Sequence, residues 1–257
     1  MKFLSAAHTD VGTTKDINQD SMCVMEAETE QGPVLMALVA DGMGGLKKGE
    51  LASATVLAAF TEWFENELPA QLSAHNVMDE IRYSWERMVK ELGRRIMEYG
   101  KQHHIQLGST LTAMLFLPDG RYLIGHVGDS RAYCITGSAV NVLTEDQTVT
   151  ANEVRLGKLT PEQAKTDPRR SVLLQSIGAS KTVIPTFLTG TYRTGECYML
   201  CSDGFRHVIS PEEIGSTFSP QICVDETVMK AKITELIELN KQRNESDNIS
   251  ALLVRAV

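Results

Sequence analysis

The feature that most constrains the fold is a continuous apolar segment, Pro33 to Ala40, which ends directly in Asp41-Gly42-Met43-Gly44-Gly45. A run this short, with proline at its start, is typical of a β-strand covered on both faces. A strand holds the side chain at its end in place, and a following glycine lets backbone carbonyls and ligands approach closely. The segment therefore predicts a buried strand that ends at Asp41 and holds this carboxylate in a functional site.

Aspartates recur beside the ends of other predicted strands. A single Asp-Gly pair is most often a turn. Several carboxylates at strand ends repel one another unless cations hold them together, and their oxygens suit Mg²⁺ or Mn²⁺. The pattern therefore predicts a divalent-metal site. The candidate residues are Asp20, Asp41, Asp129, Asp203 and Asp247.

Hydrophobic periodicity predicts a layered α+β sandwich. Helical spacing marks three segments, within 52–63, 81–99 and 229–237, and proline-containing caps predict short helices after Thr160 and Ser210. The further predicted strands are 109–116, 122–127, 132–135, 196–201 and 249–254. Strands dominate both ends of the chain, and two long helices follow one another between Gly49 and His104. This order suits antiparallel sheets covered by helices.

Composition limits the partners and the location. A chain of 257 residues with no repeat or flexible linker is expected to form one domain, 1–257. The net charge of −8 argues against nucleic acid or an anionic membrane as a partner. No apolar run approaches the length of a membrane span, and the start lacks a secretory apolar region, so we expect a cytoplasmic protein.

Other catalytic chemistries lack their sequence patterns. The five cysteines are odd in number and have no Cys-x-x-Cys spacing, so we expect reduced and mostly buried thiols. No His-x-x-His or His-Glu-x-x-His pattern supports a zinc hydrolase. Ser130 lacks the Gly-x-Ser-x-Gly frame of a nucleophilic serine.

Nine short motifs follow one another along nearly the whole chain. They are Asp10-Val-Gly12, Lys15-Asp-Ile-Asn-Gln-Asp20, Asp41-Gly-Met-Gly-Gly45, Gly108-Ser-Thr110, His126-Val-Gly-Asp-Ser-Arg131, Leu143-Thr-Glu-Asp146, Leu174-Gln-Ser-Ile-Gly178, Cys201-Ser-Asp-Gly204 and Asp247-Asn-Ile-Ser250. Each motif alone is weak. Their ordered set resembles the metal-dependent PPM phosphatases, also called the protein phosphatase 2C family, in their compact bacterial form.

The resemblance implies a four-layer αββα sandwich, in which two antiparallel β-sheets are flanked by antiparallel helices. It also implies two Mn²⁺ or Mg²⁺ ions in a core site and a third, weaker ion. Asp41 would bridge the two ions, with the carbonyl of Gly42 on one and Asp203 and Asp247 on the other. By the same resemblance, Asp20 would act through a metal-bound water and Asp129 would help to hold the third ion.

The function implied is hydrolysis of phosphoserine and phosphothreonine in proteins by a water that bridges two metals, which reverses serine/threonine kinase signalling. The partners would be phosphorylated proteins, including a serine/threonine kinase, and the enzyme would be a monomer. The segment 144–180 would correspond to the flap beside the active site.

Three residues depart from the family pattern. Lys15 replaces an arginine that grips the substrate phosphate, Met43 replaces the histidine of animal members, and Gln19 replaces a frequent glutamate. Lysine offers a point charge and no bidentate fork, so phosphate binding by Lys15 is expected to be weaker. Two alternatives therefore stay open: a catalytically weak or silent phosphoprotein-binding regulator, and a hydrolase of small phosphoesters.

Overall fold

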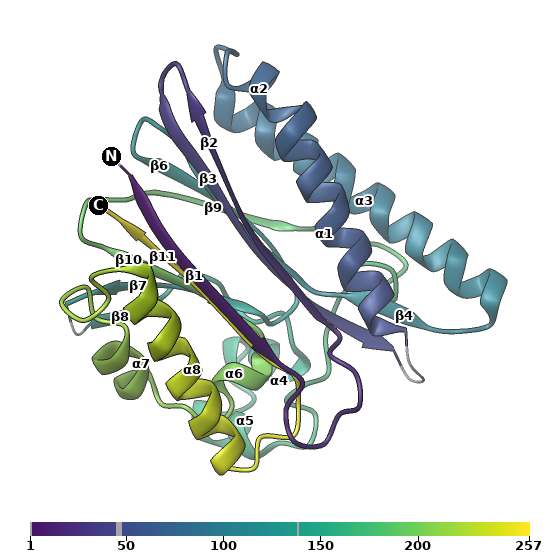
Figure 1. Ribbon diagram of the computed structural model, residues 1–257. Coiled ribbons are helices and arrows are strands. Elements are labelled where there is room, and N and C mark those ends of the chain that lie inside the picture. The colour runs from purple at the N-terminus through teal and green to yellow at the C-terminus, as the bar shows by residue number, and fades with distance from the viewer. Residues whose placement is uncertain (1, 45–47, 138) are drawn as a thin grey trace.

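The structure is a computed structural model that describes residues 2–44, 48–137 and 139–257. Gly45, the last residue of the Asp41 motif, lies outside the described residues. Two antiparallel β-sheets pack face to face, and helices cover the outer face of each sheet (Figure 1). This arrangement confirms the expected αββα sandwich.

The first sheet has the strand order β2-β3-β5-β6-β9, and β4 pairs with the end of β3. Its strands are β2 (Asp20–Thr29), β3 (Gly32–Gly44), β4 (Leu107–Ser109), β5 (Leu111–Phe116), β6 (Arg121–Val127) and β9 (Thr186–Thr191). Every residue from Val34 to Ala40 in β3 has no exposed surface, because β3 lies between two neighbours and is covered on both faces.

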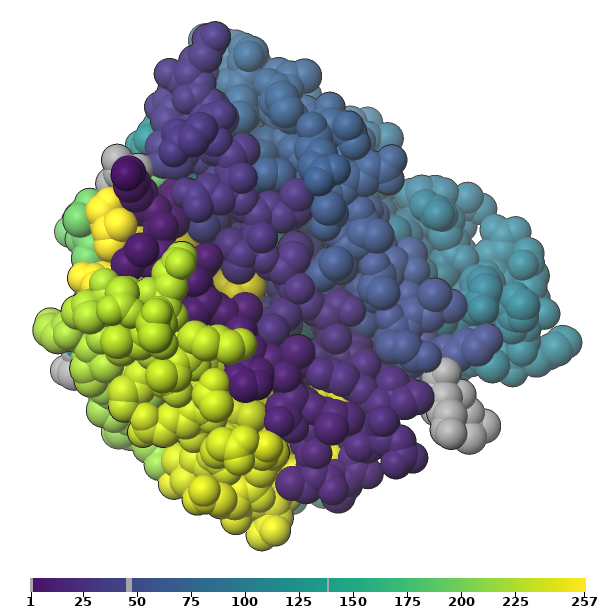
Figure 2. Space-filling view, viewed as in Figure 1, coloured from purple at the N-terminus to yellow at the C-terminus, as the bar shows by residue number. Residues whose placement is uncertain are grey.

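The second sheet has the order β1-β11-β10-β7-β8, so the strands nearest the two ends of the chain are neighbours. Its strands are β1 (Phe3–Asp10), β7 (Arg131–Thr136), β8 (Ala139–Val142), β10 (Cys197–Cys201) and β11 (Ile249–Ala256). Figure 2 shows the N-terminal segment, in purple, packed against the C-terminal segment, in yellow.

Helices cover both outer faces. The first sheet carries α1 (Gly49–Asn66), α2 (Leu68–Gln71) and α3 (Val77–His103), and the second carries α7 (Pro211–Thr217) and α8 (Glu226–Gln242). Both predicted capping boxes form, with the hydroxyls of Thr160 and Ser210 accepting from backbone amides. None of the helices in the described part of the chain is long and apolar enough to cross a bilayer.

Three apolar cores correspond to the interfaces between the four layers. Trp63 and Trp85 pack edge to face between the first sheet and its helices. Phe205 and Phe218 pack between the second sheet and its helices. Phe116 and Tyr198 meet between the two sheets, with ring centroids 5.1 Å apart.

Two strand boundaries differ from the sequence prediction. β3 does not stop at Asp41 but continues to Gly44, because Gly42 to Gly44 pair with β4. The predicted strand 109–116 is divided at Thr110 into β4 and β5. Asp41 consequently lies inside a strand, where its backbone is held from both sides.

The connection between β8 and β9 contains α4 (Val149–Arg155) and α5 (Pro161–Thr166). Several backbone hydrogen bonds attach it to the body of the protein, including bonds near each of its ends. The backbone amide of Gln147 donates to the Gly128 carbonyl at 2.8 Å, and Ser109 and Ile177 exchange two backbone hydrogen bonds of 2.9 Å.

Candidate active site

Asp20 and Asp41 are brought together by strand pairing. Asp20 begins β2, and it lies directly opposite Asp41 of β3 in the antiparallel register. The backbone of Asp41 is fixed by Thr110, whose hydroxyl accepts from the Asp41 amide at 2.9 Å and whose amide donates to the Asp41 carbonyl at 2.9 Å. These two carboxylates form the part of the site that belongs to the first sheet.

Asp203 and Asp247 come from the second sheet. Asp203 is the first residue of α6 (Asp203–Arg206), two residues after β10, and Asp247 lies two residues before β11. The hydroxyl of Ser250 in β11 donates to Oδ2 of Asp20 at 2.6 Å, so one hydrogen bond joins the two sheets at the site. The site is therefore built where the two sheets meet.

Asp129 lies in the turn between β6 and β7 and is buried. The residue next to it, Ser130, has its hydroxyl oxygen 2.8 Å from the hydroxyl oxygen of Thr110. Thr110 in turn bonds the Asp41 backbone, so Asp129 is linked to Asp41 through these two hydroxyls. The guanidinium of Arg206 donates to the Asp129 carbonyl at 2.9 Å and lies 3.9 Å from its carboxylate. Asp129 is thus held near Asp41 and Asp203 and next to Arg206, a cation of the protein itself.

The carboxylates influence one another electrostatically. Burial, and then the charges of Asp20 and Asp203, raise the pKa of Asp41 well above its usual range. Burial and the charge of Asp203 also raise the pKa of Asp129, and burial is the main cause of the raised pKa of Asp20. Each of these groups is costly to hold ionised in the absence of a cation, and a bound cation would reverse this effect.

Asp203 behaves differently because His207 contacts it. Burial acts to raise the pKa of Asp203, but the hydrogen bond and charge of His207 hold it below the usual range. Nε2 of His207 lies 3.3 Å from Asp203 Oδ2, and its Nδ1 lies 3.3 Å from Glu245 Oε2. The other oxygen of Glu245 accepts from the amides of Ser246 and Asp247 at 2.8 and 2.9 Å. His207 and Glu245 therefore connect Asp203 with the loop that carries Asp247.

Lys15 lies at the rim of the site on the loop between β1 and β2. Its ammonium group is 3.1 Å from Asp247 Oδ1, and its side chain is 42% exposed. Burial acts to lower the pKa of Lys15, but the contact with Asp247 and the charges of Asp41 and Asp203 raise it. The loop is held by Asn248, whose side-chain amide donates to the carbonyls of Val11 and Ile17 at 2.9 and 3.2 Å.

Glycine is required at two of the candidate positions. A Cβ on Gly42 would collide with the Gly49 carbonyl and lie 2.6 Å from the Gln19 carbonyl, and a Cβ on Gly204 would collide with the Asn248 carbonyl. The glycines that follow Asp41 and Asp203 therefore allow neighbouring backbone segments to approach the site closely.

The donor set fits hard divalent cations. Oδ1 of Asp203 is buried and has no hydrogen-bond partner among the described residues, although buried carboxylate oxygens are normally satisfied. Carboxylates and carbonyls are the oxygen donors that Mg²⁺ and Mn²⁺ prefer. Across residues 2–44, 48–137 and 139–257, no three His, Cys, Asp or Glu side chains are already arranged to hold an ion.

Sequence reasoning missed the residues that support the aspartates. His207 lies outside the nine sequence motifs. Arg131 and Asp146, which were noted only as parts of motifs, form a two-pronged ion pair at 2.7 and 2.8 Å, and Arg206 donates to the same carboxylate at 3.1 Å. A histidine four residues after Asp203, at the end of one helical turn, was the available signal for the Asp203 contact.

Known proteins resemble this chain along its whole length. The family model described as Protein phosphatase 2C matches residues 8–253. The serine/threonine phosphatase stp of Listeria innocua is 28% identical over 249 residues, which are 96% of this chain and 93% of that protein. The structure of the Streptococcus agalactiae serine/threonine phosphatase superposes with a TM-score of 0.86 at 28% identity and covers 100% of both chains.

A further solved structure carries metal. The catalytic domain of the serine/threonine protein phosphatase PstP in complex with two manganese ions superposes with a TM-score of 0.77 at 27% identity, over 98% of this chain and 97% of that one. Fold and site together define an enzyme of the protein serine/threonine phosphatase class. This chain belongs to the protein phosphatase 2C family.

Proposed function

We propose that the protein hydrolyses phosphoserine and phosphothreonine in phosphorylated proteins, and that it reverses the action of a serine/threonine kinase. The observation that carries the proposal is the meeting of carboxylates from both sheets, one of which, Asp203, has a buried oxygen with no hydrogen-bond partner in the described structure. The names of the relatives, which are serine/threonine phosphatases, support the substrate class.

The aspartates would hold Mn²⁺ or Mg²⁺. Asp41 would contact both ions of a core pair, with the Gly42 carbonyl on one ion and Asp203 and Asp247 on the other. The two manganese ions in the PstP structure support a core site with two ions. Such a pair lowers the pKa of a water held between the ions, directs it at phosphorus and stabilises the charge that develops on the phosphoryl oxygens.

The remaining acidic residues would complete the site from outside this core. Asp20, whose Oδ2 accepts a hydrogen bond from Ser250, would contribute through a metal-bound water, as the family resemblance implies. Asp129 would help to hold a third, weaker ion. The nearby guanidinium of Arg206 supplies competing positive charge, which is consistent with weak binding there.

Lys15 would bind the phosphate of the substrate. It lies at the exposed rim beside Asp247, and its single ammonium would give up part of its contact with this carboxylate when a phosphate arrives. Met43, two residues after Asp41, has no proton to donate, so protonation of the leaving alkoxide would fall to water. Gln19 supplies an amide where a carboxylate would add negative charge.

We also propose that residues 1–257 act as one phosphatase domain, with 144–180 as a flap that contributes to substrate choice. The attachment of this segment through Gln147 and Ile177 supports a fixed position next to Asp129 and β4. A monomeric state and a cytoplasmic location stay predictions from the sequence.

The test is phosphate release from a phosphothreonine peptide and from a small aryl phosphate, with Mn²⁺, with Mg²⁺ and with chelator. Asp203→Asn is expected to lower metal-dependent release by about 100-fold or more, because several kcal/mol of charge stabilisation are lost. Asp79→Asn makes the same chemical change at an exposed position of α3 and serves as the control.

Three outcomes would contradict the proposal. Full activity of Asp203→Asn would remove this residue from the site. Turnover of the aryl phosphate alone would favour a hydrolase of small phosphoesters. Binding of the phosphopeptide without release under every metal condition would favour the regulatory alternative.

A further inference from the structure

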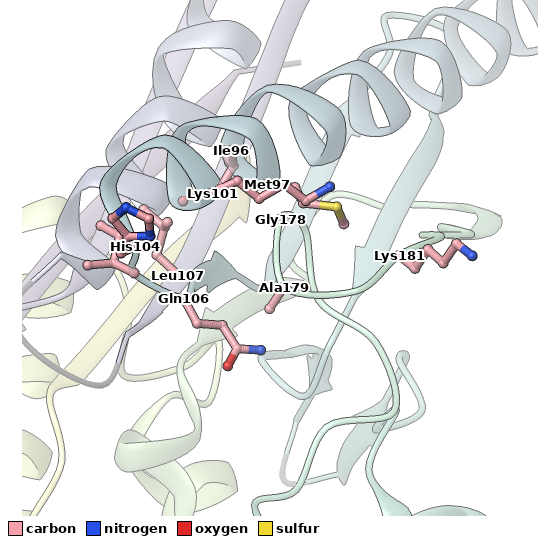
Figure 3. Close-up of a pocket in the computed structure, with 11 residues that line it drawn as sticks. Ile96, Met97, Lys101, His104, Gln106, Leu107, Gly178, Ala179 and Lys181 are labelled. Atoms are coloured by element: carbon pink, nitrogen blue, oxygen red, sulfur yellow. The ribbon is translucent and has the colours of Figure 1, made fainter.

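Two adjoining cavities open beside the candidate active site. The larger, of about 650 Å³, lies between the C-terminal turns of α3 and the segment Gly178–Lys181 (Figure 3). The second, of about 420 Å³, begins at Met43 and Gly44. They share the wall formed by residues 104–107 and Ala179, so together they form one groove that starts immediately after Gly42.

The charge of the groove is opposite to that of the protein. Four basic residues line it, and no aspartate or glutamate does so among the described residues. The chain as a whole has 33 acidic and 25 lysine or arginine residues. We call this cavity the basic groove, and its basic residues are Lys48, Lys101, His104 and Lys181.

The lysines of the basic groove are available for a ligand. Lys101 and Lys181 are exposed, and neither forms an ion pair within the part of the chain that the structure describes. Lys48 contacts a neutral partner, since its ammonium lies 3.3 Å from the hydroxyl of Tyr99 and 5.6 Å from the ring centroid. All three ammonium groups therefore lack a carboxylate partner in the described structure.

The walls of the basic groove are held by close backbone packing. Gly178 has a positive φ of 99°, and a Cβ there would collide with Ile96 of α3. A Cβ on Gly108 would lie 3.0 Å from Ala179. The Ser109–Ile177 backbone pair fixes the same segment to β4. The positions of the basic residues are consequently set by the folded core.

We propose that the basic groove binds acidic residues that flank the phosphorylated residue of a protein substrate. This inference rests on the proposed phosphatase function, because the phosphorylated residue must lie at the aspartates for its neighbours to reach the groove. The apolar walls, such as Ile105 and Leu107, suit the stems of peptide side chains, and the lysines suit their negative groups. The anionic groups would be carboxylates or further phosphates.

The test compares kcat/KM for phosphothreonine peptides with neutral, Asp/Glu-rich, doubly phosphorylated and Lys-rich flanks. The wild type is expected to favour the acidic peptides over the neutral one by about threefold to tenfold, which corresponds to two exposed ion pairs. Lys101→Gln/Lys181→Gln should bring this ratio close to one while activity on an aryl phosphate stays unchanged. The preference should also weaken at high salt.

Lys90→Gln/Lys232→Gln is the matched control. It removes the same total charge from lysines on the outer helices α3 and α8, each of which pairs with a glutamate of its own helix. The control should keep the preference for acidic peptides. Comparison of the Asp/Glu-rich and doubly phosphorylated peptides shows which kind of anion the groove prefers.

Binding separates failure of the groove from failure of the proposed function. Fluorescence anisotropy with Asp203→Asn measures peptide binding without turnover, and the Lys101→Gln/Lys181→Gln changes should weaken binding of acidic peptides alone. The inference would be overturned if the double variant lost the same affinity for neutral and acidic peptides. It would also be overturned if the wild type showed no preference for acidic peptides. Absence of hydrolysis with this binding pattern intact would overturn only the proposed phosphatase activity.

Discussion

The ammonium group of Lys15 lies 3.1 Å from Oδ1 of Asp247. The proposed phosphate-binding residue and a proposed metal ligand therefore face one another directly. Lys15 also lies within reach of the charges of Asp41 and Asp203. A lysine in this position neutralises part of the acidic site, and a substrate phosphate would have to share it with Asp247.

Lys15→Ala is expected to lower kcat/KM for a phosphothreonine peptide by about 10- to 100-fold, because one hydrogen bond between charged groups is lost. Lys15→Arg should raise kcat/KM a few-fold, because guanidinium can bind two phosphate oxygens at once. Steady-state kinetics with saturating Mn²⁺ check both values. Lys241→Arg changes a comparable lysine–aspartate pair, with Asp10, and should have no effect. Unchanged kinetics in Lys15→Ala would show that Lys15 is a surface residue without a role.

His207→Ala is expected to weaken Mn²⁺ binding by about 10- to 100-fold, the usual loss when a partner of a metal ligand is removed. His207 bonds Oδ2 of Asp203 and leaves Oδ1 as the oxygen without a partner, so it orients this carboxylate. Isothermal titration calorimetry measures the affinity, and His207→Gln should recover part of it. His8→Ala, which removes a ring bonded to Thr234 on the outside of the second sheet, is the control. Tighter binding in His207→Ala would mean that the imidazole competes with the metal.

The stability that His126 contributes is expected to decrease below about pH 6.5, the usual pKa of histidine. Its ring is buried between Thr112 and the Glu145 carbonyl, and burial lowers its pKa. A lowered folded-state pKa means that the unfolded chain takes up the proton first. The stability that the neutral His126 ring contributes is thus fully present above the pKa of the unfolded chain. It is lost as the pH falls towards the lower pKa of the folded state.

Denaturant unfolding in chelator between pH 5 and 8 checks this expectation. One such group changes the free energy of unfolding by at most about 1.4 kcal/mol for each pH unit. His126→Gln should be less stable at pH 8, and the difference in free energy of unfolding between wild type and variant should shrink as the pH falls. His75→Gln alters an exposed histidine and should follow the wild type. A difference between wild type and His126→Gln that stays constant from pH 8 to pH 5 would show that His126 does not titrate in this way.

Local patterns predicted much of the fold correctly. The apolar run from Pro33 became the central strand β3, and Thr160 and Ser210 formed the capping boxes that their sequences indicated. These features depend on near neighbours in the chain. The edge strand β9 was missed because its residues are only partly buried, and Gly190 in it packs against the ring of Tyr122, which no sequence window contains.

In the candidate site too, features set by near neighbours in sequence were predicted, and contacts between distant residues were not. The five aspartates were visible because each stands next to a strand. Their supports were not, since His207 meets Glu245 across 38 positions and Lys15 meets Asp247 across most of the chain. The basic groove combines three distant segments, so its charge could not be read from any one of them.

The position of β11 in the chain has a consequence for synthesis if the proposed site is correct. Residues 247–256 are translated after every other part of the site. They provide Asp247, the hydroxyl that bonds Asp20, and the strand that β1 and β10 share as their common neighbour. A growing chain that still lacks them has half a sheet and an incomplete set of carboxylates. With Asp247 as a proposed metal ligand, we expect a chain that still lacks β11 to be unable to remove phosphate, and activity to begin once β11 pairs with β1 and β10.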